Sequence, residues 1–310
     1  MLQKRSLIAL SAGAAIVLLY VLNMLYFSLL PDFFTIEKKS GAPLGTAFVA
    51  TTASLMEHEL TGSGGWLPND TPLSPTWLLD NKQNFQLGVL EVVRYNTRVL
   101  RDGLSRQRTS DSIDADCDKA FTSFSNDPYK WIFPSAEGKY QEGIERLNSY
   151  QQRLLLGSAY FYPRSDNLIQ LLEQYASLLG GVNTRLLNAS RTAREARLDK
   201  SAASSNMPQY QRVPWLKIDD NFYFARGVGY GLLHMFKAVQ IDFAQVLHDK
   251  NADIIMDEII ASLEETNFEP LLVTNGGKDG IFASHSSNLR VFLDDARQKI
   301  NSLMTILAQG

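Results

Sequence analysis

The most constraining feature of the sequence is an uninterrupted apolar run near its N-terminus. No charged residue occurs between Ser6 and Leu30, and Pro31 and Asp32 end the run. The stretch from Leu7 to Leu30 is long enough to cross a hydrocarbon core of about 30 Å at about 1.5 Å rise per residue. The sequence therefore predicts one transmembrane helix, with the rest of the chain folded on one side of the membrane.

A cleavable signal peptide is the alternative interpretation of this run. Such peptides have an apolar core of only about 7–15 residues, followed by small residues at a cleavage site. Here the run is longer, and the sequence FSLLPDFF at 27–34 offers no such site. We therefore expect residues 1–31 to form a cytoplasmic N-terminus and an uncleaved membrane anchor.

The charges that flank the run predict its orientation. Lys4 and Arg5 precede it, whereas the charges just after it, in residues 32–39, sum to zero. Positively charged flanks stay on the cytoplasmic side. We therefore expect a bacterial inner-membrane protein with its domain in the periplasm. Ala9 and Gly13 form a small-xxx-small pair in the span, which leaves a homodimer open as an alternative to a plain anchor.

The composition of the chain is that of a folded protein. Of its 310 residues, 45% are hydrophobic and 20% are charged, which are ordinary proportions for a globular chain. The formal net charge is -3, and a mildly acidic domain argues against nucleic-acid binding, which needs a basic face. The single cysteine, Cys117, excludes an intrachain disulfide and a cysteine-based metal site.

Apolar residues recur at helical spacing through the rest of the chain. Residues 165–179 carry leucines and a tyrosine on one face, and the pair Gly180-Gly181 is expected to end that helix. The segments 221–249 and 288–308 show the same periodicity, and no alternating strand pattern of useful length occurs. The predicted class is all-α, an N-terminal transmembrane helix followed by a large multi-helix bundle domain.

Loop signals predict how the chain is divided. Residues 32–43 are expected to be a tether, and residues 44–310 the all-α domain. A long polar stretch at 199–215 is the one interruption that suggests a subdomain break.

Three glycines, Gly227, Gly229 and Gly231, lie inside the most apolar predicted helix. Each costs the helix about 1 kcal/mol relative to alanine. Glycine at such positions indicates close approach of a second helix or of a ligand, and we expect a helix.

The motifs that resemble catalytic or metal sites fail on spacing. A Glu-His-Glu sequence at 57–59 matches half of a zinc-protease motif, but Gly62 stands where the second histidine is needed. Aspartates at 114, 116 and 118 have the spacing of a calcium loop, but Lys119 stands where glycine is required. We therefore expect no catalytic, cofactor-binding or metal-binding residue.

All four tryptophans lie within three residues of a proline, in or beside predicted loops. The rings either plug the ends of the bundle or converge on an aromatic groove for a glycan, lipid or peptide. For such a groove the sequence nominates Trp66, Asn69, Asp70, Trp77, Asp80, Asn81 and Trp131.

A second candidate binding surface is a stripe of arginines. Arg94, Arg98 and Arg101 have i, i+4, i+7 spacing, which places them on one face of a helix. They would bind an anionic head group, a glycan carboxylate or an acidic partner. The alternative is that they pair with nearby acids such as Glu91 and Asp102.

Several stretches resemble a bacterial family catalogued as a domain of unknown function. They are GWLPND at 65–70, LLDNKQNFQLGVLEVVRYNTRVLRD at 78–102 and YFYPRSDNL at 160–168. The resemblance covers nearly the whole chain. It implies one N-terminal span, a helical domain and a Gram-negative envelope setting, and it implies no catalytic residue.

These features favour a non-catalytic, membrane-anchored scaffold or interaction partner of another envelope protein. One alternative is a hydrolase or lytic enzyme that acts on the cell wall, since one buried glutamate can serve as general acid. Another is a glycan- or lipid-binding module that uses the tryptophan loops. An acid with a raised pKa in a deep cleft would favour the enzyme. A flat apolar or basic patch would favour the scaffold, and an aromatic groove the binding module.

Overall fold

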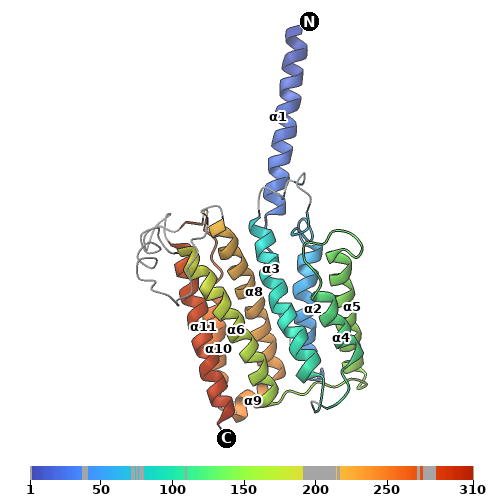
Figure 1. Ribbon diagram of the computed structural model, residues 1–310, viewed down its shortest axis with the longest axis vertical. Coiled ribbons are helices and arrows are strands. Elements are labelled where there is room, and N and C mark those ends of the chain that lie inside the picture. Colours follow the sequence, from blue (N-terminus) through green and yellow to red (C-terminus); the bar gives the residue numbers. More distant parts are fainter. Residues whose placement is uncertain are drawn as a thin grey trace, which may run out of the picture.

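The computed structural model describes residues 2–36, 41–70, 74, 76, 80–108, 110–190, 214, 217–270, 273–274 and 284–309, with side chains from residue 10 onward. The fold is all-α, as predicted (Figure 1). In chain order the helices are α1 (Leu2–Phe27), α2 (Thr46–Thr61), α3 (Asn81–Val99), the π-helix η2 (Leu100–Leu104), α4 (Ala115–Phe124), α5 (Ala136–Leu155), α6 (Ser165–Ser190), α8 (Ile218–Asp242), α9 (Ala244–Asp249), α10 (Asp253–Glu264) and α11 (His285–Ala308).

Helix α1 projects from one end of the bundle, and the longer helices of the bundle run roughly along the same direction (Figure 1). Within the described ranges, α1 is the helix that is long and apolar enough to cross a membrane, and its window Leu10–Phe27 is not buried inside the protein. We call the end from which α1 projects the α1 end. The C-terminus of α11 lies at the opposite, far end (Figure 1).

Helices α3 and α8 touch through their backbones at the centre of the domain. A Cβ atom on Gly227 would collide with the carbonyl of Phe85, and one on Gly88 would collide with the carbonyl of Phe224. One turn further along α8, a Cβ on Gly231 would lie 3.1 Å from the side chain of Val92. The prediction that these α8 glycines admit a neighbouring helix is confirmed for Gly227 and Gly231. It is wrong for Gly229, where a Cβ would collide with the side chain of Thr266, just after the end of α10.

The predicted helix end at Gly180-Gly181 is wrong, because α6 continues to Ser190. Neither glycine has a positive φ. Gly180 lies instead where α11 crosses α6, and a Cβ there would be 3.5 Å from the guanidinium of Arg297. The Nε of Arg297 donates to the carbonyl of Ala176 at 3.1 Å. The glycine therefore serves a helix crossing and not a helix end.

The predicted helix at 221–249 is two helices, α8 and α9. Phe243 leaves helical geometry between them, with φ -106° and ψ 15°. Its buried ring packs edge-on against Phe161, with ring centroids 5.8 Å apart. The break turns the chain at the far end of the bundle.

The predicted subdomain break at 199–215 lies outside the described residues, apart from Pro214. Helix α6, which precedes it, packs against α11, which follows it, and both contribute to one hydrophobic core.

The segment after α1, predicted as part of a tether, packs against the bundle between α2 and α8. The ring of Phe33 stacks on Tyr230 and on His234, with centroid distances of 5.3 and 5.5 Å. The ring of Phe34 stacks on His58 and on His234, at 4.7 and 4.0 Å. We call these five side chains the α1 junction.

Hydrogen bonds hold the backbone of the same segment. The Tyr230 hydroxyl donates to the carbonyl of Asp32 at 2.9 Å, and the backbone N–H of Phe34 donates to Nε2 of His234 at 3.3 Å. The other ring nitrogen of His234 lies 2.8 Å from the carbonyl of Tyr230, to which it donates. Burial lowers the pKa of His234 to about 4, so the ring is neutral and can accept from Phe34.

We expect Gly227→Ala to destabilise the domain by roughly 1–3 kcal/mol, because the added methyl group meets the backbone of α3 and neither helix can yield without repacking. Gly181→Ala is the matched control, since nothing lies within 4 Å of that position. It should stabilise the domain by about 0.5–1 kcal/mol through its helix propensity. Thermal unfolding of the full-length chain in detergent measures both. A neutral Gly227→Ala would contradict the described contact between α3 and α8.

Candidate functional site

Trp66 lies inside the domain and holds the connection between α4 and α5. Its side chain is 3% exposed, and its ring packs edge-on against Tyr140, with centroids 4.9 Å apart. The indole Nε1 donates to the carbonyl of Pro128 at 2.9 Å. This tryptophan is therefore a structural plug and not the wall of an aromatic groove.

Asn69 and Tyr140 hold the same connection. The Nδ2 of Asn69 donates to the carbonyl of Lys130 at 3.2 Å and to the carboxylate of Glu137 at 2.9 Å. The hydroxyl of Tyr140 donates to the carbonyl of Asn126 at 3.2 Å. Two loops far apart in the sequence, 62–70 and 125–135, are thereby joined.

Arg94 reaches the start of the same connection from α3. Its Nε donates to the carbonyl of Phe124 and its Nη2 to the carbonyl of Asn126, both at 2.8 Å. Its third nitrogen pairs with Glu91 at 2.8 Å. Each of the three guanidinium nitrogens thus has a partner within the domain, and the pair with Glu91 is the one that the alternative interpretation of the arginine stripe named. We call Trp66, Asn69, Arg94 and Tyr140 the frame.

The frame presents an apolar tip, the segment Tyr129–Phe133. The backbone N–H of Ala136 donates to the carbonyl of Lys130 at 2.7 Å and closes the loop behind the tip. The exposed fractions of the tip's apolar residues are 59% for Tyr129, 61% for Trp131, 50% for Ile132 and 92% for Phe133. A contiguous exposed apolar patch on a rigid support marks an interaction site.

The apolar tip lies at the α1 end of the bundle, where the connection between α4 and α5 turns (Figure 1). Contacts confirm the placement. Gly64 lies against the ring of Phe27, the last residue of α1, since a Cβ on Gly64 would be 3.1 Å from it. Gly64 is two residues before Trp66, which binds Pro128 at the root of the tip.

Asp70, another nominated residue, binds Ser74 and Thr76, and Ser74 lies beside α1. Its carboxylate accepts hydrogen bonds from the hydroxyls of Ser74, at 3.0 Å, and of Thr76. The hydroxyl of Tyr20 in α1 donates to the carbonyl of Ser74 at 3.4 Å. Trp77 lies outside the residues that the structure describes.

Asp80 and Asn81 do not belong to the frame, since they stand at the beginning of α3. Burial, followed by the charges of Asp80 and Asp219, raises the pKa of Asp220 to about 7. Like charges are thus gathered there, where Asp80 lies close to Asp219 and Asp220.

Arg98 and Arg101 face α4. The guanidinium of Arg101 lies 4.0 Å from the ring centroid of Phe121 and pairs with Asp102 at 2.7 Å. The guanidinium of Arg98 lies 5.8 Å from the same ring. Arg101 is thus paired within the domain, whereas Arg98 is exposed beside the rings of Tyr95 and Phe121, and neither arginine joins the apolar tip.

The sequence prediction missed Arg153, at the end of α5. It pairs with Asp114 at 2.8 Å and with Asp116 at 2.7 Å, and Asp114 caps α4 by accepting from the backbone N–H of Cys117. Because these partners lie 37 and 39 residues from Arg153 in the sequence, spacing gave no signal for the pair.

Glu59 is a buried acid near the α1 junction. It is 1% exposed, and burial raises its pKa to about 7 against the opposing charge of Lys82. The Nζ of Lys82 donates to Ser63, and Gln86 donates to the backbone carbonyls of Glu59 and Gly65. Among the described residues, no hydrogen bond reaches either carboxylate oxygen of Glu59. A substrate cannot reach this carboxyl group, which is enclosed by the domain.

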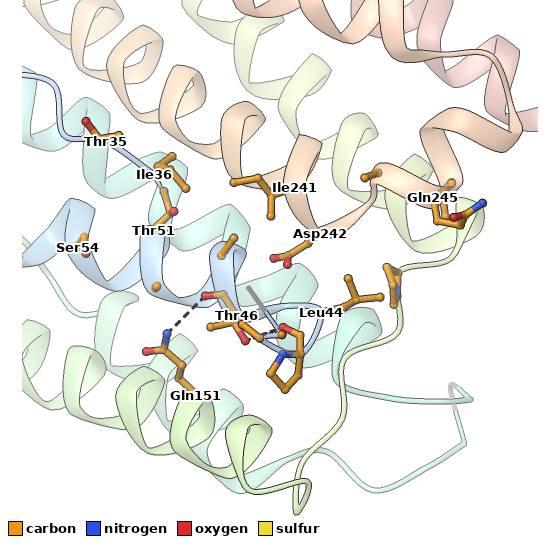
Figure 2. A pocket seen from close by; sticks show the side chains of 18 of the residues that line it. Thr35, Ile36, Leu44, Thr46, Thr51, Ser54, Gln151, Ile241, Asp242 and Gln245 are labelled. Carbon is orange, nitrogen blue, oxygen red and sulfur yellow. Dashed lines mark hydrogen bonds between the residues drawn. The ribbon is translucent and has the colours of Figure 1, made fainter. Parts of the chain in front are cut away.

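A cavity of about 600 Å³ lies between α2, α5, α8 and α9 (Figure 2). Asp242 is the one acid among its described lining residues, and burial raises its pKa to about 6. Its carboxylate accepts the backbone N–H of Phe48 at 2.7 Å, and so occupies the N-terminus of α2. Thr46 and Gln151 meet across the cavity wall, the Gln151 amide donating to the Thr46 carbonyl at 3.5 Å. The acid is a helix cap and not a free proton donor.

Within the described part of the chain, no three His, Cys, Asp or Glu side chains lie close enough to hold a metal ion.

The chain belongs to the family described as "Uncharacterized protein conserved in bacteria (DUF2333)", whose model matches residues 3–310. The resemblance found in the sequence is thereby confirmed. No curated protein and no solved structure matches the chain.

We expect the stability of the domain to fall with rising pH through Glu59. Its pKa is near 4.5 when unfolded and about 7 when folded, so its favourable contribution is complete below pH 4.5 and lost between pH 4.5 and 7. The loss amounts to roughly 3 kcal/mol. Chemical denaturation in detergent at pH 5 and pH 8 should show a smaller decrease for Glu59→Gln than for the wild type. Glu57→Gln, an exposed change on the same helix, should behave as the wild type. Equal pH dependence in all three proteins would contradict this assignment.

Proposed function

We propose that the chain is a non-catalytic scaffold of the bacterial envelope. In this proposal α1 spans the inner membrane with its N-terminus in the cytoplasm, and the bundle stands in the periplasm. The exposed apolar surface of α1 and the positive residues Lys4 and Arg5 before it support this placement. The domain holds another envelope protein at a fixed height and orientation above the bilayer.

The α1 junction is the observation that carries this proposal. Phe33 and Phe34 stack on side chains of α2 and α8, and two hydrogen bonds hold their backbone segment to α8. A flexible tether is sufficient for an enzyme that searches for its substrate. Placing a partner at a set distance from the membrane requires a coupled anchor instead.

Two of the acids with raised pKa values, Glu59 and Asp242, do not favour the enzyme alternative. Glu59 is enclosed by the domain, and Asp242 caps the N-terminus of α2. A general acid must instead lie within hydrogen-bond reach of a substrate atom. The lipid-binding alternative has a specific observation in its favour, the apolar tip.

The topology is tested with cysteine labelling of cells. Leu156→Cys places a thiol at an 81% exposed position at the end of α5, whereas the native Cys117 is buried and burial raises its pKa, so it does not react. After permeabilisation of the outer membrane alone, a membrane-impermeant maleimide should label Leu156→Cys. It should label Gln3→Cys only after lysis. The reverse pattern would contradict the proposed orientation.

The scaffold role is tested by breaking the junction. A photoreactive amino acid at Tyr160 or Val291, which are exposed, should give one discrete product with the same envelope protein. The double variant Phe33→Ala, Phe34→Ala should reduce its yield severalfold, because the domain is then no longer held in place.

The matched control is Leu25→Ala, Leu29→Ala, two exposed side chains close to the junction, which should leave the yield unchanged. Thermal unfolding confirms that the domain remains folded in both variants. An unchanged yield after loss of the junction would contradict a positioning role, as would the lack of any discrete product.

A further inference from the structure

We propose that the apolar tip, Tyr129–Phe133, inserts into the interface of the bilayer that α1 crosses, and so forms a second membrane contact of the domain. This inference rests on the proposed anchoring by α1. It assigns a lipid surface as the ligand of the patch around Trp131, which the sequence analysis nominated without choosing among glycan, lipid and peptide.

The position of the tip supports a lipid surface. The tip belongs to the connection that turns above α5, at the α1 end of the bundle (Figure 1). Its root at Pro128 is joined through Trp66 and Gly64 to Phe27, the last residue of α1. The α1 junction fixes the bundle relative to α1. The tip therefore faces the membrane whenever α1 is in it.

The chemistry of the tip is that of membrane-interface segments. Tryptophan and tyrosine gather at the level of the lipid head groups, where an apolar ring body and a polar atom are both accommodated. Trp131 and Tyr129 supply these side chains, and Ile132 and Phe133 supply apolar surface that reaches deeper. Lys130 adds a positive charge that suits lipid phosphates.

The frame explains how such a tip is presented to a membrane. Its four side chains donate to the backbone carbonyls of residues 124, 126, 128 and 130, so the shape of the loop is set before it meets lipid. A preformed loop loses little conformational freedom on binding. Phe133, almost fully exposed, protrudes from the surface, which suits insertion into a bilayer better than enclosure of a glycan.

Depth-dependent quenching tests the proposal on the full-length chain. Ile132→Cys carries an environment-sensitive nitrobenzoxadiazole label, while the buried Cys117 stays unlabelled. The protein is reconstituted in phosphatidylethanolamine and phosphatidylglycerol vesicles with nitroxide lipids, labelled at the head group or at mid-chain. Leu156→Cys at the far end and Leu18→Cys in α1 are the reference positions.

The label at Ile132 should show blue-shifted emission and be quenched severalfold more strongly by head-group nitroxides than the label at Leu156. A label at Ile132 that behaves like the one at Leu156 would overturn the proposal. A blue shift without lipid quenching would also overturn it, because it indicates that a protein surface covers the tip.

The label at Leu18 separates this proposal from the proposed anchoring. If mid-chain nitroxides quench Leu18 but no lipid quenches Ile132, the anchoring stands and the second contact fails. If Leu18 is not quenched, both proposals fail together.

Two further variants test how the tip binds. In the Ile132→Cys background, Trp131→Ser with Phe133→Ser should abolish the quenching, because the inserting rings are gone. Trp66→Phe removes the N–H that binds Pro128 and part of the buried ring behind the loop, and should reduce the quenching and speed hydrogen exchange in residues 125–133. Full quenching in the double serine variant would overturn insertion through these side chains.

Discussion

The stacking of two phenylalanines at the α1 junction fixes the orientation of the whole domain relative to α1. Phe33 and Phe34 lie between α2 and α8, against a histidine whose neutral form accepts a backbone N–H from the same segment. The longer helices run roughly along the direction of α1, so one end of the bundle always faces α1 and the other always points away from it (Figure 1). The position of every other surface relative to α1 follows from this orientation of the bundle.

A contiguous group of apolar side chains in water carries an unfavourable free energy, so a loop that exposes such a group must be held in shape by other contacts. Here the support comes from polar atoms inside the domain. Trp66 and Asn69 donate hydrogen bonds to backbone carbonyls of the connection between α4 and α5. Arg94 donates two more, from two of its nitrogens, to carbonyls at the start of that connection. Three side chains nominated as binding residues thus set the shape of a loop that carries the exposed surface.

Helix periodicity, the charge-free run and the α8 glycines were sufficient to predict the fold class, the long apolar helix α1 and the helix contact at Gly227. Trp131 was nominated, but Ile132 and Phe133 were missed, although three consecutive apolar residues between two prolines are a readable signal. Whether Trp66 lies inside or outside depends on a donor–acceptor pair 62 residues apart in the sequence, which periodicity cannot reveal. The Gly180-Gly181 pair was misread because a helix crossing and a helix end both select glycine.

Neutron reflectometry of the full-length chain in a supported bilayer tests most directly whether the anchor and the domain are one unit resting on the membrane. We expect a dense protein layer that begins at the lipid head groups and extends about 40 Å, the length of an upright helix such as the 26-residue α6. A water-rich gap between the head groups and a diffuse protein layer would contradict it, because such a profile describes a domain that moves freely on a tether.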